Sequence, residues 1–123
     1  MNRLMTAGQD VRWRERVIQQ AKLDPFARLL DIGAGTGDLA REALKQRPRA
    51  SIVAADFTIE MMRIGQKSRS LPWSAADALN LPFAEETFDA IVSGFLMRNV
   101  ADIQQALKEQ YRALKPGGRI VIL

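Results

Sequence analysis

The chain has 123 residues, enough for one domain with a hydrophobic core, and its 47% hydrophobic and 26% charged residues are typical of a globular protein. It contains no cysteine and no histidine, which excludes disulfides, metal sites built on thiolates or imidazoles, and Ser-His-Asp hydrolysis within this chain. Its net charge of +4 is spread along the sequence, which favours a mixed surface over a patch for nucleic acid, and no apolar run approaches the roughly 20 residues of a membrane-spanning helix.

Short β-like runs alternate with amphipathic helical runs along the chain, which predicts a parallel α/β sheet. The opening segment MNRLMTAGQDVRWR lacks the apolar stretch of a signal peptide, so we expect a cytoplasmic protein. Helices are predicted at residues 10–22, 38–47, 58–67 and 102–114, and strands at 27–32, 51–56, 73–77, 89–94 and 119–123.

Apolar residues spaced three and four apart predict the buried face of each helix. The predicted sets are Trp13, Val17, Ile18 and Ala21 in the first helix, Leu39, Ala40, Ala43 and Leu44 in the second, and Ile103, Ala106, Leu107, Tyr111 and Leu114 in the last. The final strand, RIVIL, has no following element to pair with. We therefore expect a fragment of a longer domain, with pairing of a second molecule along residues 119–123 as the alternative.

The stretch LLDIGAGTGD is an apolar strand that runs into glycines at every second position. Gly33 allows a tight exit from the strand, Gly35 lets a ligand approach the bare backbone, and Gly37 permits close packing where the next helix begins. The free N–H groups at that helix end favour a carboxylate or a phosphate. Asp56, roughly 20 residues further along, follows the second strand, where a carboxylate binds ribose in nucleotide-binding βαβ units.

Two aspartates flank this glycine loop. Asp31 precedes the first glycine, and Asp38 stands where the dinucleotide-binding fingerprint has its third glycine. A carboxylate pair disfavours an anionic pyrophosphate and suits an ammonium or sulfonium group. S-adenosylmethionine carries both cations, together with a carboxylate for the loop amides and a ribose for Asp56.

A further aspartate, Asp77, ends the third strand and is followed by Ala78. Its carboxylate can accept from the exocyclic amine of adenine, while the Ala78 N–H donates to the ring. Because strand ends converge in an open α/β sheet, Asp31, Asp56 and Asp77 are predicted to form one constellation, with turn or cap roles as the alternative. Asp89 and Asp102 are predicted to be structural, Asp102 as a helix N-cap.

The segments LLDIGAGTGDLA, AADFTIEMM, SAADALNLPFAEETFDAIVSGFLMRNV and ALKEQYRALKPGGRIVIL resemble class I S-adenosylmethionine-dependent methyltransferases. NRLMTAGQDVRWR and FLMRNV are similar, more narrowly, to the ubiquinone/menaquinone biosynthesis C-methyltransferase family. The resemblance implies an α/β fold, a Rossmann-like doubly wound parallel sheet of about five strands in the order 3-2-1-4-5. It implies one S-adenosylmethionine-binding domain over residues 1–123, with a lid-like helix at 1–24, a core at 25–123, and the C-terminal strands of the full fold absent.

The same resemblance implies the cofactor-binding positions, which are Asp31, Gly33, Gly35, Thr36, Asp56, Asp77, Ala78 and Ser93. Thr36 and Ser93 offer hydroxyl groups to the crevice, or else are an ordinary loop threonine and a strand-end serine. Phe57 packs on the adenine or ribose in this interpretation, and ordinary core packing is the alternative.

The acceptor side is implied by two segments of the resemblance. Arg98 and Asn99, just after the fourth strand, would orient a quinone oxygen, with a helix-start or surface role as the alternative. Arg12 and Trp13 belong to the lid-like segment. The chain departs from the family pattern at Leu96, where the family usually has glycine or a similar residue nearby.

The implied activity is C-methylation of a demethylated menaquinone or ubiquinone precursor. The alternatives are a methyltransferase for another small molecule and a non-catalytic cofactor-binding half-domain that self-associates through residues 119–123. No general base is assigned, because the chain lacks histidine and cysteine. The segment SGFL differs from the Asp/Asn-Pro-Pro-aromatic motif of nucleic-acid amino-methyltransferases, so we expect no nucleic-acid partner. A lipid-soluble quinone implies peripheral contact with a membrane.

Overall fold

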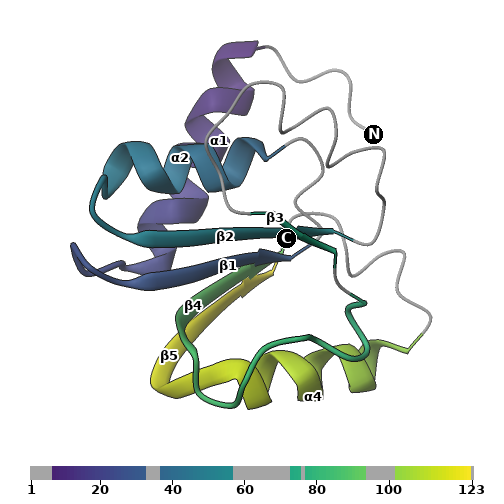
Figure 1. The fold of residues 1–123 in the computed structure, drawn as a ribbon. Helices are drawn as coiled ribbons and strands as arrows, with labels where there is room; N and C mark the ends of the chain where they lie inside the picture. Colours follow the sequence, from purple (N-terminus) through teal and green to yellow (C-terminus); the bar gives the residue numbers. More distant parts are fainter. Residues whose placement is uncertain (1–6, 33–36, 57–72, 76, 94–101, 123) are drawn as a thin grey trace.

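The computed structural model describes residues 7–32, 37–56, 73–75, 77–93 and 102–122. Strands alternate with helices along this chain, as the hydropathy pattern predicts (Figure 1). The elements are α1 (Ala7–Ala21), β1 (Arg28–Ile32), α2 (Asp38–Gln46), β2 (Ser51–Asp56), β3 (Trp73–Ala75), β4 (Phe88–Ser93), α4 (Ile103–Ala113) and β5 (Leu114–Ile122). The helix predicted at 58–67 lies outside the described residues.

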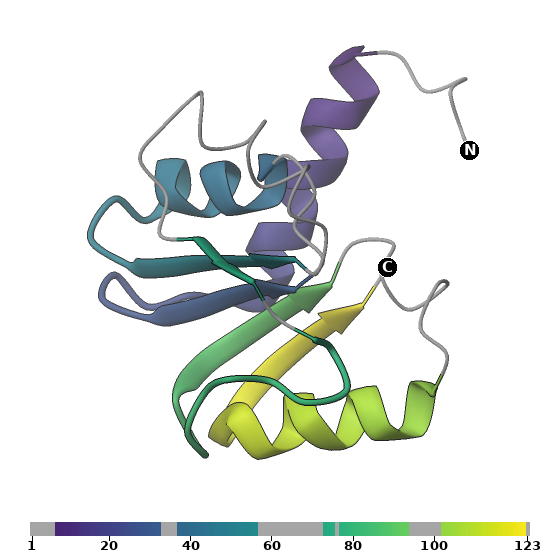
Figure 2. The same cartoon turned by 45° about the vertical axis from the view of Figure 1, so that its right-hand side comes forward.

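The strands form one five-stranded parallel sheet in the order β3-β2-β1-β4-β5, which confirms the predicted topology. Helices α1 and α2 lie on one face of this sheet and α4 lies on the other (Figure 2). The chain order reverses between β1 and β4, and open α/β sheets bind their ligands beside the carboxyl ends of the strands at such a switch point.

The pairing register places the carboxyl ends of neighbouring strands, where the predicted site residues lie, next to one another. Ile32, the last residue of β1, lies opposite Ala55 of β2 and Ser93 of β4. Asp56, the last residue of β2, lies opposite Ala75, the last residue of β3. The carboxyl ends of the four strands β1 to β4 therefore lie next to one another.

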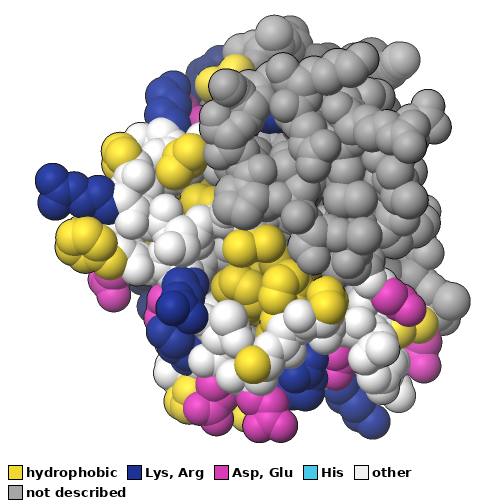
Figure 3. All heavy atoms as spheres, viewed as in Figure 1, with side chains coloured by type: hydrophobic (Ala, Val, Ile, Leu, Met, Phe, Trp, Pro, Cys, Tyr) yellow, Lys and Arg dark blue, Asp and Glu magenta, His cyan; other side chains and the backbone are white. Residues whose placement is uncertain are grey.

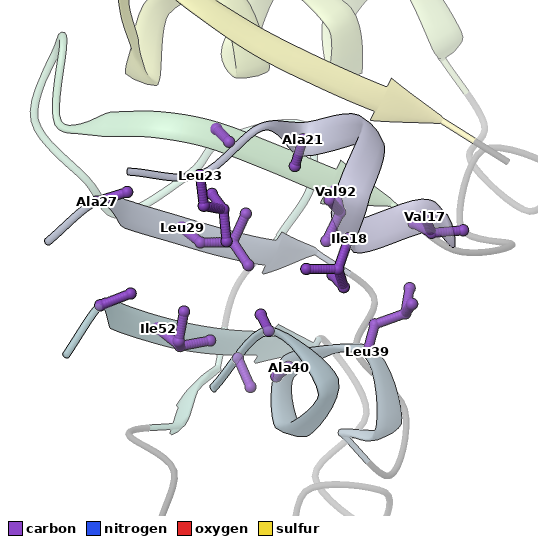
Figure 4. Packing of buried hydrophobic residues seen from close by; sticks show 14 residues of the cluster. Val17, Ile18, Ala21, Leu23, Ala27, Leu29, Leu39, Ala40, Ile52 and Val92 are labelled. Atoms are coloured by element: carbon purple, nitrogen blue, oxygen red, sulfur yellow. The ribbon is translucent and has the colours of Figure 1, made fainter. Parts of the chain in front are cut away.

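The face under α1 and α2 holds the larger of two apolar cores (Figure 4). Each fully buried leucine or isoleucine contributes roughly 1.5–3 kcal/mol through apolar burial. Both predicted helix faces are confirmed, since their members are buried or packed partly buried against this core. They are Trp13, Val17, Ile18 and Ala21 of α1, and Leu39, Ala40, Ala43 and Leu44 of α2.

The prediction for the face of α4 is confirmed at Ala106, which is buried, and at Leu114, which packs partly buried against the second core, and it is wrong at the other three members. This helix buries Ala106, Gln110 and Ala113, and Ala113 belongs to the second core together with Phe88 and Ile91. The larger apolar residues of the helix lie on an adjoining face. Three predicted members are exposed: Ile103 at 50%, Leu107 at 38% and Tyr111 at 77%.

Several element ends differ from the predictions. α1 begins at Ala7 rather than Asp10, so Asp10 lies inside the helix instead of capping it. β3 ends at Ala75, because Asp77 forms a turn with Leu79. β5 begins at Leu114, and its register shifts between the pairs at Phe88 and Ala90 of β4, so KPGG lies inside the strand.

The surface carries both signs of charge. On the described part of the face in Figure 3, lysine and arginine side chains are interspersed with aspartate and glutamate around α4 rather than forming a single basic patch. None of the helices within the described ranges has the length and apolar character needed to span a bilayer.

Candidate functional site

Asp31 is a buried carboxylate in the middle of the sheet. It lies in β1 opposite Ala54 and Val92, and only 1% of its surface is exposed. Side chains alternate along a strand, so Asp31 lies on the same face as Leu29, beneath α1 and α2. Asp31 lies one residue before the end of β1 at the β1/β4 switch point, which makes its buried carboxylate a candidate for contacting a ligand there.

The glycine loop is described at its last residue. Gly33, Gly35 and Thr36 lie outside the described residues, as does Phe57. Gly37 is buried and precedes α2 with φ 92° and ψ 18°, a left-handed conformation that glycine adopts without a steric penalty. As a glycine, this N-cap residue provides no side-chain cap to the N–H groups at the start of α2, and such a helix end is suited to a carboxylate.

Asp38, the second aspartate beside the loop, differs from Asp31 in its surroundings. Its side chain is 58% exposed and forms ion pairs with Arg14 of α1 at 3.8 Å and Arg41 at 3.5 Å. These arginines offset its negative charge and connect α1 to the first turn of α2. The two flanking carboxylates therefore do not form an equivalent buried pair.

Asp56 is described as the last residue of β2, at the same sheet edge as Ile32 and Ser93. Asp77 lies two residues beyond the end of β3, and its side chain is exposed. Its Oδ1 accepts a hydrogen bond from Leu79 N at 2.9 Å, which orients the carboxylate. Ala78 beside it is half-buried.

Ser93 ends β4 next to Ile32 and is completely buried. Paired residues of parallel strands share a face, so Ser93 lies on the α4 side of the sheet while Asp31 lies on the α1 and α2 side. Its hydroxyl oxygen makes no hydrogen bond within the part of the chain that the structure describes. The two polar residues thus reach the switch point from opposite faces.

The predicted acceptor-side residues fall into two groups. Arg12 of α1 is exposed, and Trp13 is half-buried against the apolar core beneath that helix. Arg98 and Asn99 lie outside the described residues. Within the described ranges, no group of three or more acidic side chains is arranged to hold a metal ion.

Asp89 and Asp102 have the structural roles predicted for them. Asp102 Oδ1 accepts from Gln105 N at 3.0 Å and caps α4. Asp89 accepts from Arg28 N at 2.8 Å and lies 3.4 Å from Lys115 Nζ. It lines a cleft of about 160 Å³ at the amino ends of β4 and β5, which is the opposite edge of the sheet from the candidate site.

A pair of charged residues on α4, Glu109 and Arg112, was not anticipated as part of the site. Arg112 donates to both carboxylate oxygens of Glu109, at 2.9 Å and 3.0 Å, and also donates to Phe83 O and Leu81 O. Glu109 accepts from Leu81 N at 2.8 Å. Their partners in the loop after β3 are backbone atoms of Leu81 and Phe83, and hydropathy patterns carry no signal for such contacts.

The hydrogen bond from Arg112 lowers the pKa of Glu109 below its ordinary value. A lowered carboxyl pKa stabilises the folded state above the ordinary value, and this stability is lost as the pH falls through the folded-state pKa. We expect Glu109→Gln to remove this component from the dependence of the unfolding midpoint on pH in the acid range below the ordinary carboxyl pKa of 4.5. Urea unfolding across that range measures it, with the exposed Glu86→Gln as the control. An unchanged acid profile in the Glu109 variant would contradict the assignment.

The chain matches the model of the ubiE/COQ5 methyltransferase family over residues 1–123. It is 43% identical to the ubiquinone/menaquinone biosynthesis C-methyltransferase UbiE of Desulfotalea psychrophila, over 100% of this chain and 51% of that protein. It is 44% identical to the demethylmenaquinone methyltransferase of Thermus thermophilus, over 100% of this chain and 58% of that protein. The chain therefore spans little more than half the length of these relatives.

Solved structures share the fold. A putative S-adenosyl-L-methionine-dependent methyltransferase from Methanococcus maripaludis matches 89% of this chain and 52% of its own, with a TM-score of 0.79 and 30% identity. The [4+2]-cyclase SpnF matches 90% of this chain and 43% of its own, with a TM-score of 0.84 and 27% identity. These matches confirm the Rossmann-like methyltransferase fold, and the family match over the whole chain places this protein in the ubiE/COQ5 methyltransferase family.

Proposed function

We propose that this chain is the cofactor-binding part of an S-adenosylmethionine-dependent methyltransferase. The observation that carries the proposal is the buried carboxylate of Asp31 at the β1/β4 switch point, in a chain that the family model matches from end to end. In this proposal residues 25–123 form the cofactor-binding core, and residues 1–24, which include α1, cover it as a lid-like segment.

Residues at three strand ends are proposed to bind different parts of the cofactor. Asp31 attracts the cationic methionine end, Asp56 binds the ribose hydroxyls, and Asp77 with Ala78 N–H binds the edge of the adenine. The start of α2, whose N-cap residue is Gly37, offers its N–H groups to the methionine carboxylate. Gly33, Gly35, Thr36 and Phe57 complete the proposed set.

The proposed acceptor is the ring carbon of a reduced, demethylated quinone. S-adenosylmethionine supplies an activated methyl group, so the protein contributes mainly alignment of the acceptor carbon with it. Arg98 and Asn99 after β4, with Arg12 and Trp13 of α1, are proposed to face the acceptor. A lipid-soluble quinone would bring a cytoplasmic protein into peripheral contact with a membrane. Two relatives whose names specify quinone biosynthesis support this choice.

Incubation with methyl-labelled S-adenosylmethionine and reduced demethylmenaquinone tests the proposal. Label in the quinone, absent when the quinone is left oxidised, is the expected result. Transfer to other small acceptors but not to the quinol would favour a methyltransferase of different substrate. Binding of S-adenosylmethionine with no transfer would instead favour a cofactor-binding half-domain.

The half-domain alternative makes a prediction of its own. In the described chain β5 pairs with β4 alone, and its Ile122 is 42% exposed at this sheet edge. An exposed strand edge can pair with a second copy. Light scattering distinguishes the cases, because self-association through β5 predicts a dimer mass, and a strictly monomeric protein would eliminate it.

Ser93→Ala is expected to separate binding from stability. The buried hydroxyl has no described hydrogen-bond partner, and leaving such a group unsatisfied costs about 1–3 kcal/mol. Removing it should leave the free energy of unfolding unchanged or raise it, while the affinity for S-adenosylmethionine falls by about threefold to tenfold. Calorimetric titration and urea unfolding measure the two effects, with the exposed Ser51→Ala as the control. A loss of stability without a loss of affinity would show that Ser93 serves the fold alone.

A further inference from the structure

Helix α4 is hydrogen-bonded to the loop that follows β3, residues 77–87, by three side chains. Gln105 Nε2 donates to Leu79 O at 3.1 Å. Arg112 donates through Nη1 to Phe83 O at 2.9 Å and through Nη2 to Leu81 O at 3.0 Å. Glu109 Oε1 accepts from Leu81 N at 2.8 Å and is itself held by Arg112. These bonds fix the loop backbone on the α4 side of the sheet.

The same loop orients the carboxylate of Asp77. Leu79 N donates to Asp77 Oδ1 at 2.9 Å, and Asn80 N donates to Asp77 O at 2.9 Å. Leu79 is therefore shared, because its N–H holds Asp77 while its carbonyl accepts from Gln105. Two hydrogen bonds, linked through the backbone of Leu79, therefore join α4 to the carboxylate. Asp77 is exposed, so local packing contributes little to its orientation.

We propose that Gln105, Glu109 and Arg112 are positioning residues that set the selectivity of this site for adenine over other purine bases. The inference rests on the proposed function, in which Asp77 and Ala78 N–H bind the adenine edge. The three residues act through the loop and do not contact the cofactor. Their effect is to hold the acceptor of Asp77 and the donor of Ala78 at the spacing of the adenine amine and ring nitrogen.

Base selectivity follows from the chemistry of that edge. Adenine presents an amine donor and an unprotonated ring nitrogen, whereas hypoxanthine presents a carbonyl oxygen and a ring N–H. A carboxylate and an N–H held in fixed positions pair with the amine and the ring nitrogen of adenine. With hypoxanthine the carboxylate faces a carbonyl oxygen and the N–H faces another N–H. A site built to hydrogen-bond one pattern rejects the other strongly, because the mismatched polar groups stay unpaired. A loop free to move would discriminate less.

Titration with S-adenosylhomocysteine and with S-inosylhomocysteine tests the inference on the full chain. We expect the wild-type chain to prefer the adenine compound by at least about 100-fold. In Gln105→Met, which keeps the side-chain length and removes the donor, this preference should fall by about threefold to tenfold. The matched control is Gln104→Met, on the same helix at an exposed position, and its preference should equal that of the wild type.

Arg112→Lys provides a second variant, because lysine keeps the charge beside Glu109 but lacks the fork that reaches both Leu81 O and Phe83 O. It should lower the preference for adenine in the same direction. If these side chains served only the fold, the variants would lose affinity for both compounds equally and the ratio of the two affinities would not change. That result in the folded variants would overturn the inference. Failure of the wild-type chain to bind either compound would instead overturn the proposed function, and this inference with it.

Discussion

Asp31→Asn is expected to lower the affinity for S-adenosylmethionine by about 100-fold, or about 3 kcal/mol. The substitution keeps the size and shape of the side chain and removes its negative charge. Asp31 is 1% exposed, and a charge pair screened so little by solvent is worth about 2–5 kcal/mol when one partner is removed. Isothermal titration of the folded variant, with folding checked by circular dichroism, measures the loss.

Asp38→Asn is the matched control for this prediction. Asp38 lies on the other side of the glycine loop, but it is 58% exposed and paired with Arg14 and Arg41. Exposed ion pairs contribute about 0–1 kcal/mol, so the affinity of the Asp38→Asn variant for S-adenosylmethionine should change by less than about fivefold. Equal losses in the two variants would mean that general charge near the loop, rather than the buried carboxylate, attracts the cofactor.

Gly118→Ala is expected to destabilise the fold by about 2–4 kcal/mol. A Cβ atom at Gly118 would lie 2.7 Å from Asp89 O and 2.7 Å from Leu114 Cδ1. The carbonyl belongs to the backbone of β4 and cannot move without disturbing the sheet. The clash falls where the β4–β5 register shifts, so the variant should weaken the pairing of β5. Urea unfolding measures the change in free energy.

Gly117→Ala separates this steric clash from backbone strain. Gly117 has φ +81°, but a Cβ there meets nothing within 4 Å. The cost should therefore be that of a left-handed non-glycine residue, about 1–2 kcal/mol. If Gly117→Ala proved as costly as Gly118→Ala or costlier, the close approach of β4 and β5 would not be what requires glycine at 118.

The sequence predicted the sheet well because its strands carry unambiguous patterns. SIVAAD was predicted at 51–56 and β2 has those bounds, since a buried parallel strand reads as a continuous apolar run. The strand order is also confirmed. The end of β5 nearest α4 was harder, because KPGG carries a strong turn signal, yet the register shift accommodates it within the strand.

The face of α4 shows why periodicity alone was insufficient. Two apolar stripes run along this helix, one of alanines and one containing Leu107 and Tyr111. Residue size favours the second stripe, yet the helix buries the first on the side of the sheet that holds Phe88 and Ile91. These partners belong to β4, so the sequence of the helix alone does not show which stripe faces them.

The sequence alone was sufficient to propose the aspartates at the strand ends as candidate site residues. It was not sufficient to predict the side chains of α4 that contact distant backbone atoms. Asp31 interrupts an apolar strand, and Asp77 follows one, so both were visible as chemical features in the sequence. Arg112 and Glu109 act on carbonyl and N–H groups about 30 residues away along the chain. Every residue type carries the same backbone carbonyl and presents it in the same way. The amino-acid sequence therefore does not reveal which backbone groups Arg112 and Glu109 contact.

Calorimetric titration of S-adenosylmethionine into the wild-type chain tests the central claim most directly. The proposed site, which combines Asp31, Asp56 and Asp77, predicts saturable binding of one molecule per chain, complete below about 1 mM, the upper end of ordinary enzyme affinities. The absence of saturable binding at that concentration, by a chain that is folded under the same conditions, would contradict it.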